Sequence, residues 1–130
     1  MAILTLEQLN EAYQLKKELE GAEKIASRLV ADIEDESDLI PGHPYYPSMV
    51  RYNRLRKQVE AMAGDLKDTL SRIKNARGFL ICDLHFRAGY TYAAIGKILQ
   101  DDPAIVRQSA YWAIARVHKN AMKETEENKQ

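Results

Sequence analysis

Residues 84–119 constrain the fold more than any other stretch, because specific residues mark the helix boundaries within it. Gly89 can adopt the left-handed conformation that closes a preceding helix, and Thr91 offers an N-cap hydroxyl two residues later. An apolar face at helical spacing follows, formed by Ile95, Ile98 and Leu99. The sequence therefore predicts a short helix that starts after Thr91 and ends at Leu99.

A second helix start follows almost at once, at Asp102 and Pro103. The aspartate can cap the first turn, and proline suits the first helical position because it has no N–H to leave unbonded. The helix beyond has an apolar stripe at spacings of 4, 3 and 4 residues, made of Val106, Ala110, Ala113 and Val117. A short helix, a tight turn and a longer helix are together typical of a helix-turn-helix.

The side of this second helix opposite the stripe carries small and polar side chains. At about 3.6 residues per turn, they are Ala104, Arg107, Gln108, Tyr111, Ala115, His118 and Lys119. Arg107 can bind guanine O6 and N7 in a bidentate way, and Gln108 can do the same with adenine N6 and N7. The Ala104 methyl can touch a thymine, and Tyr111 lies one turn further on. The alternative is the solvated face of an ordinary surface helix, but the preceding helix and turn favour DNA.

Charge is divided unevenly along the chain. The whole sequence has 19 basic and 19 acidic residues, a balance that argues mildly against a DNA-binding protein. Residues 1–70, however, have a net charge of −4, residues 71–123 of +6 and residues 124–130 of −2. A basic region at one end fits local attraction to phosphates. The predicted phosphate contacts are Arg87, Lys97, Arg116 and Lys119.

A longer motif runs through the same stretch. Its residues are Leu84, Phe86, Gly89, Thr91, Tyr92, Ile95, Gly96 and Leu99, followed by Val106, Arg107 and Gln108. Over residues 77–119 it resembles region 4 of bacterial sigma factors. It is more similar to phage late-gene transcription regulators of the ArpU and RinA type, and to related phage proteins with a coiled-coil first half. The resemblance implies late-gene control through DNA contacts by Arg107 and Gln108. Pro103 and Ala104 depart from the sigma pattern, so a sigma-like target sequence is not implied.

The first half of the chain is predicted to form a long antiparallel helical hairpin, similar to a coiled coil. Thr5 and Gln8 form a capping box at its start. One seam repeats at spacings of 3 and 4: Ala12, Leu15, Leu19, Ala22, Ala26, Leu29 and Ile33. A second follows: Tyr52, Leu55, Val59, Met62, Leu66, Thr69 or Leu70, and Ile73. Seams of matching length imply two paired helices, each about 40 Å long.

The predicted hairpin has a charged and proline-rich end. The first helix should stop near Asp35, within the acidic run 34–38, because negative charge is unfavourable at a helix C-terminus. The prolines of residues 41–47 should exclude a helix, so Ser48 is the predicted cap of the second one. A basic cluster should pair with the acidic run: Arg51, Arg54, Arg56 and Lys57. A two-helix hairpin buries little apolar surface by itself. It should therefore pack on the C-terminal region or on a second copy.

A further helix is predicted from Asn75 to Ala88. Gly78 weakens its start, and the predicted core residues are Leu80, Ile81 and Leu84. Cys82 and His85 have the spacing C-x-x-H, but no second pair accompanies them. The sequence therefore predicts a buried free thiol and a surface histidine instead of a zinc site. His43 similarly has no partner at metal spacing and is interpreted as a loop residue. Beyond Lys119 a frayed acidic tail is expected.

These observations predict an all-α protein with three parts: a helical hairpin for dimerisation or partner binding (1–74), a helix-turn-helix DNA-binding module (75–121) and a flexible acidic tail (122–130). The expected function is a sequence-specific, double-stranded DNA-binding transcription regulator of phage or prophage origin, acting as a homodimer. The alternatives are a packaging adaptor like a small terminase subunit, or a sigma-like module that acts on RNA polymerase.

Other functions find little support in the sequence. It contains no phosphate loop, activated serine, paired carboxylates or metal cluster, so no enzyme, cofactor, metal or small-molecule substrate is expected. The single cysteine excludes an internal disulfide and favours a reducing compartment. The first residues do not resemble a signal peptide, and no run approaches the roughly 20 apolar residues of a membrane span. A cytoplasmic location in a bacterial host is therefore expected, with no membrane association.

Overall fold

The computed structural model of the protein describes residues 3–31, 42 and 46–128. Its elements, in order, are α1 (Leu6–Ala31), α2 (Tyr46–Ser71), α3 (Ala76–Cys82), a π-helical turn η2 (Asp83–Arg87), α4 (Tyr92–Leu99) and α5 (Pro103–Asn128). The all-α prediction is confirmed, since the described residues include no strand. In the same residues, no helix is both long and apolar enough to cross a membrane.

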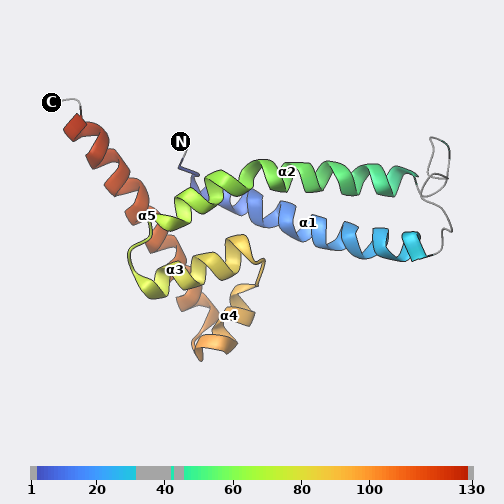
Figure 1. Ribbon diagram of the computed structural model, residues 1–130. Helices are drawn as coiled ribbons and strands as arrows, with labels where there is room; N and C mark the ends of the chain where they lie inside the picture. The colour runs from blue at the N-terminus through green and yellow to red at the C-terminus, as the bar shows by residue number, and fades with distance from the viewer. Residues whose placement is uncertain (1–2, 32–41, 43–45, 129–130) are drawn as a thin grey trace.

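The helices α1 and α2 lie side by side and run in opposite directions (Figure 1). The predicted capping box begins α1: the Thr5 N–H donates to Gln8 Oε1 at 2.9 Å, and the Gln8 N–H donates to Thr5 Oγ1 at 3.1 Å. Several residues of the two predicted seams are buried, namely Ala12, Ala22, Ala26, Leu55 and Leu66. The seam spacing therefore identified much of the surface along which the two helices meet.

The start of α2 differs from the prediction. The helix begins at Tyr46, so Ser48 lies inside its first turn and is not the cap, and Pro47 is helical. Proline is tolerated there because the first N–H groups of a helix have no acceptor within it. The predicted helix end near Asp35, and the pairing of the acidic run 34–38 with the basic cluster, lie outside the described residues.

One hydrophobic core joins the two long helices to the C-terminal helices. Its buried residues include Leu9 of α1, Leu66 and Leu70 of α2, and members of every later element: Ile81, Cys82, Phe86, Ile95, Val106, Ala110, Ile114 and Val117. The packing of the first half on the C-terminal region, one of the two expected arrangements, is thus present. The residue 74/75 boundary between the predicted parts does not separate two cores.

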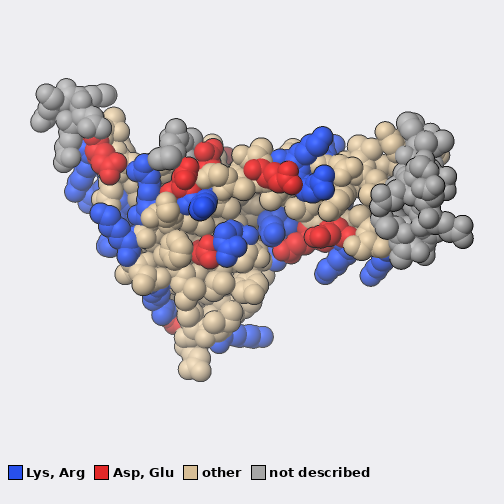
Figure 2. Space-filling model, in the orientation of Figure 1, with Lys and Arg blue, Asp and Glu red and all other residues tan. Residues whose placement is uncertain are grey.

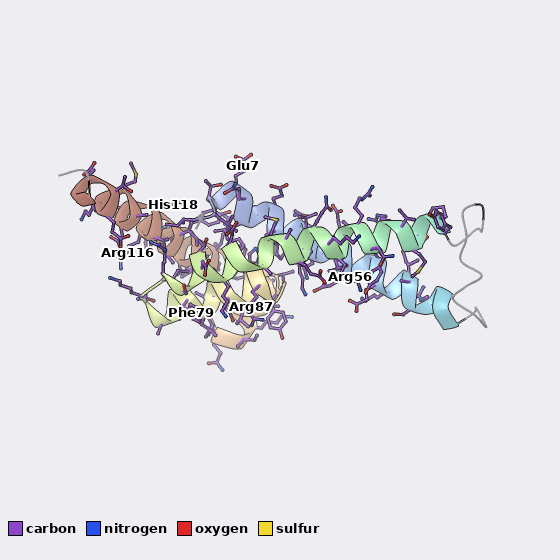
Figure 3. All side chains as sticks on the ribbon, turned by 45° about the horizontal axis from the view of Figure 1, so that its top comes forward. Glu7, Arg56, Phe79, Arg87, Arg116 and His118 are labelled. Carbon is purple, nitrogen blue, oxygen red and sulfur yellow. The ribbon has the colours of Figure 1, made fainter. Side chains whose placement is uncertain are left out.

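Leu4, which precedes α1, is hydrogen-bonded to both α2 and α5. The Leu4 N–H donates to the buried Thr69 Oγ1 of α2 at 2.9 Å. The Leu4 carbonyl oxygen accepts a hydrogen bond from His118 Nε2 of α5 at 2.8 Å. Figure 3 shows His118 on the side of α5 that faces the start of α1. His118 is therefore not part of the solvent-facing arc predicted for this helix.

Helix α3 packs closely against α5. Its N-cap is Asn75, whose Oδ1 accepts the Gly78 N–H at 2.8 Å. Gly78 is not a weak point: a Cβ there would lie 3.0 Å from the Cβ of Ala113, so its missing side chain permits the close contact. Because the buried face of α3 contains Gly78 and Ile81, Leu80 points elsewhere. Leu80 is 42% exposed, so its prediction as a core residue is wrong.

Helix α5 is longer than predicted, and its buried face is wider. It continues to Asn128, so residues 120–128 are helical where a frayed tail is expected. Its C-terminal end projects away from the other helices (Figure 1). Ile114 is buried although it is absent from the predicted stripe, whereas Ala113 is only partly buried. Positions 106, 110, 114 and 117 share one face at about 3.6 residues per turn.

A stack of three rings joins α1 to the C-terminal helices. The His85 imidazole lies between Tyr13 and Tyr92, with centroid distances of 4.1 and 3.9 Å, and its Nδ1 lies 2.7 Å from the Tyr90 carbonyl oxygen. His85 is 5% exposed, so the prediction of a surface histidine is wrong, because α1 covers it. Burial lowers the pKa of His85, the hydrogen bond to Tyr90 opposes this shift, and the charge of Lys17 adds to it.

Cys82 is buried, as predicted for a free thiol. Its Sγ lies 3.7 Å from the carbonyl oxygen of Ala110 in α5. Burial raises the pKa of the thiol to about 12. The thiolate, which is the reactive form, is therefore strongly disfavoured at neutral pH, and Cys82 contributes to packing.

Candidate nucleic-acid interface

The boundaries of α4 are set by local backbone chemistry. Gly89 has φ +84°, the left-handed conformation predicted for it. Thr91 caps α4, with its Oγ1 accepting the Ala94 N–H at 3.1 Å. Gln100 has φ 56° and ends the helix directly after Leu99. The predicted start and end of this short helix are confirmed.

The turn after α4 leads directly into α5. Asp102 Oδ1 accepts the Ala104 N–H at 2.8 Å, and Pro103 is the first helical residue, as predicted. Asp101 forms an ion pair with Arg77 of α3. The turn is thus fixed by an N-cap on one side and by a charged contact with α3 on the other.

The predicted base-reading residues lie on the first turns of α5. Ala104, Arg107 and Gln108 are exposed, and Tyr111 is 37% exposed. The buried Val106 and Ala110 lie on the other side of the same turns, where they join the core. The first turns of α5 therefore present hydrogen-bonding side chains to solvent, and their core side fixes the orientation of the helix.

The predicted phosphate-binding residues come from three elements, η2, α4 and α5. Lys97 is exposed on α4, and Lys119 is exposed on α5 eleven residues after Gln108. Eleven residues are close to three helical turns, so Lys119 points almost in the direction of Gln108, about 16 Å further along. Arg116 is nine residues after Arg107, or two and a half turns, which places these two arginines on opposite flanks of α5.

Arg87 is engaged in an ion pair within its own turn. Its Nε lies 2.6 Å from Asp83 Oδ1, and its Nη2 lies 3.0 Å from Asp83 Oδ2. These hydrogen bonds, and the negative charge of Asp83, raise the pKa of Arg87. Figure 3 shows Arg87 away from Arg116, and the bidentate carboxylate offsets its charge. Arg87 is therefore the weakest of the four candidates for a phosphate contact.

Sequence reasoning missed a set of exposed apolar residues near the candidate interface. Trp112 is 67% exposed and Ile105 49%. Ile98, predicted to share the apolar face of α4 with Ile95, is 57% exposed, so its place on that face is wrong. The signal was available for two of them, because Ile105 and Trp112 are seven residues apart and both fall outside the buried stripe. Trp112 is the single tryptophan of the chain and lines a pocket beside α5.

Positive charge is prominent along α5. Figure 2 shows Lys and Arg side chains along the edge of the molecule where Figure 1 places this helix. The exposed cationic residues of α5 are Arg107, Arg116, Lys119 and Lys123.

In the part of the chain that the structure describes, no group of three His, Cys, Asp or Glu could hold a metal ion. No protein-family model, curated protein or solved structure matches this chain, and the resemblance to sigma-type regulators therefore stays a prediction.

Proposed function

We propose that the protein is a sequence-specific DNA-binding transcription regulator of phage or prophage origin. In this proposal α4, the turn and α5 form a helix-turn-helix similar to sigma region 4. One observation carries it: α4 and α5 are each capped and joined by a fixed turn, and the first turns of α5 expose Arg107 and Gln108. In helix-turn-helix proteins, these turns of the second helix contact base edges in the major groove.

The distribution of cations supports the same proposal. Lys97 on α4 and Lys119 on α5 are exposed outside the predicted base-reading turns. Basic side chains in such positions bind phosphates and set the register of a protein on the duplex, without reading its sequence. The net charge of +6 over residues 71–123 would attract DNA to this end of the chain.

The first half of the chain would supply dimerisation. The far ends of α1 and α2 project beyond the core (Figure 1), and Ile25 and Val50 are 45% and 44% exposed there. A second copy could cover these side chains. Dimerisation would suit DNA recognition, because two helix-turn-helix units bind half-sites about 34–36 Å apart, on one side of the duplex.

Selection of bound sites from random double-stranded DNA, followed by sequencing, tests the proposal. We expect one motif to be enriched by the full-length protein and a weaker or altered motif by Arg107→Ala or Gln108→Ala. Arg56→Ala is the matched control, because Arg56 is an exposed cation on α2, outside the candidate interface. Absence of enrichment, together with binding that does not depend on salt, would contradict DNA recognition.

A further inference from the structure

A pocket of about 210 Å³ lies between α5 and the segment that leads from α2 into α3. Four cationic residues line it: Arg72, Lys74, Arg77 and Arg116. Among the described residues, no carboxylate is part of the lining. Like charges gathered around one hollow repel one another, so binding of an anion there would be favourable.

Two of the four cations are paired with carboxylates that are not part of the pocket lining, and two are available. Arg72 Nη1 lies 3.4 Å from Glu124 Oε2, and Arg77 is paired with Asp101. Lys74 and Arg116 are exposed and make no ion pair within the described part of the chain. Figure 3 shows the Arg116 side chain directed away from α5. These two residues can therefore bind an external anion without breaking an existing ion pair.

Trp112 gives this pocket a second property. It is the most exposed aromatic side chain described, at 67%, and it belongs to the pocket lining together with Ser109. An indole offers a flat apolar face and one N–H donor, which suits a ligand with both apolar and anionic parts. The backbone of a nucleic acid strand, with its alternating sugars and phosphates, has this composition.

The pocket also continues the proposed base-reading surface. Gln108, Trp112 and Arg116 are four residues apart, so their side chains follow one another in a row along α5. Successive members of the row are about 6 Å apart along the helix axis. If Gln108 and the first turns of α5 lie in a major groove, the strand that borders the groove on the α3 side would pass over Trp112 and Arg116.

We propose that this pocket binds the phosphodiester backbone of one DNA strand, with Lys74 and Arg116 contacting phosphates and Trp112 packing against the strand. The inference rests on the proposed DNA-binding function and adds a second contact site to it. That site lies on the α3 side of α5, opposite the flank that carries Arg107.

The single tryptophan makes the proposal directly measurable. The full-length protein is titrated with a mixed-sequence duplex of about 20 base pairs, roughly two helical turns of DNA, while Trp112 emission and the anisotropy of a labelled duplex are followed in parallel. We expect the emission to change and to saturate together with the anisotropy. The double variant Lys74→Ala/Arg116→Ala should bind every sequence more weakly. Its slope of log affinity against log salt should be shallower by about 2, because two phosphates are no longer neutralised by the protein.

Arg56→Ala serves as the control for a cation outside the pocket and should leave both readouts unchanged. If the full-length protein binds DNA without a change in Trp112 emission, and the double variant keeps the parent salt slope, the proposal that the pocket binds DNA is wrong. The proposed function would still stand. Absence of any DNA binding would overturn both. A Trp112 response to pyrophosphate or to a polyglutamate peptide, without one to the duplex, would show a different occupant and also overturn the inference.

Discussion

Gly96 of α4 faces the backbone carbonyl oxygen of Asp101 so closely that a Cβ on Gly96 would lie 2.6 Å from that oxygen. Real Cβ atoms essentially never approach backbone oxygen at this distance. The angle between α4 and α5 therefore depends on the absence of a side chain at this position. In the proposed complex, this angle would set how α5 enters the major groove.

Gly96→Ala should destabilise the protein. The added methyl group has to displace backbone, and overpacking of this kind costs about 1–3 kcal/mol. Gly64→Ala is the matched control, since a Cβ on this α2 glycine meets nothing within 4 Å. It should stabilise the protein by up to about 1 kcal/mol through helix propensity. Urea denaturation measures both, and equal effects of the two substitutions would contradict the close contact at Gly96.

Tyr92→Phe should stabilise the protein. The Tyr92 hydroxyl is buried without a hydrogen-bond partner among the described residues, and burial raises its pKa. Removal of a buried, unsatisfied polar group relieves a penalty of about 1–3 kcal/mol. The phenylalanine ring can keep the stack on His85. Tyr90→Phe removes a hydroxyl from a 45% exposed side chain and should change the free energy of unfolding little. Loss of stability in Tyr92→Phe would show that the hydroxyl has a partner.

Stability should fall between neutral and mildly acidic pH because of His85. Its pKa in the folded protein is lowered from the ordinary value of 6.5, first of all by burial. The unfolded chain therefore binds a proton more readily than the folded one as the pH drops below 6.5. The stabilisation is complete above 6.5 and is lost as the pH falls towards the folded pKa. Urea denaturation at about pH 7.5 and about pH 5.5, on either side of the ordinary histidine pKa, measures this effect, and His85→Phe should show a smaller difference. An equal difference in both proteins would assign the pH dependence to other groups.

Arg107→Ala and Gln108→Ala should each cost about 1–3 kcal/mol on the selected DNA site if each makes a bidentate base contact. Each should relax the preference at one base pair and leave binding to random DNA largely unchanged. Both side chains are exposed, so the melting temperature should hardly change. Competition binding on specific and random duplexes separates the cases. Equal loss on both would make the residue a phosphate contact.

The full-length protein should dimerise through the projecting ends of α1 and α2. Replacing both Ile25 and Val50 with glutamate should give monomers, because the charges would be buried in the dimer interface. The two side chains are 45% and 44% exposed in the single chain. Met122→Glu, on the projecting end of α5, is the control. Sedimentation analysis gives the result. A monomeric parent protein at high micromolar concentration would exclude the dimer, and a large ring of copies would favour a packaging adaptor.

The sequence predicts the elements whose signals are local. Thr91 and Asp102 cap helices at the expected positions because a cap depends only on neighbouring backbone groups. Two of the errors concern residues whose surroundings come from distant segments. His85 is buried because Tyr13 of α1 stacks on it. The residues next to His85 in the sequence give no sign of this contact. Leu80 is exposed because the contact of Gly78 with Ala113 fixes which side of α3 faces α5.

The candidate site follows the same division. Arg107 and Gln108 lie on the exposed side of α5, as helical periodicity predicts, whereas His118 of the same predicted arc contacts Leu4. The pocket beside Trp112 could not be predicted, because Arg72 and Arg77 reach it from other elements across the break between α2 and α3. Residue spacing carries no information about how that break folds back on α5.

The backbone of Leu4 is bonded to Thr69 on one side and to His118 on the other, and Leu4 is itself buried in the common core. Leu4 therefore joins α2 to α5. If residues 75–128 were transferred to another protein as a separate DNA-binding unit, Phe86 and Ile95 would lose the α1 and α2 side chains that share their core. A chimera intended to keep α5 in its present orientation therefore has to include Leu4, α1 and α2 together with the C-terminal helices.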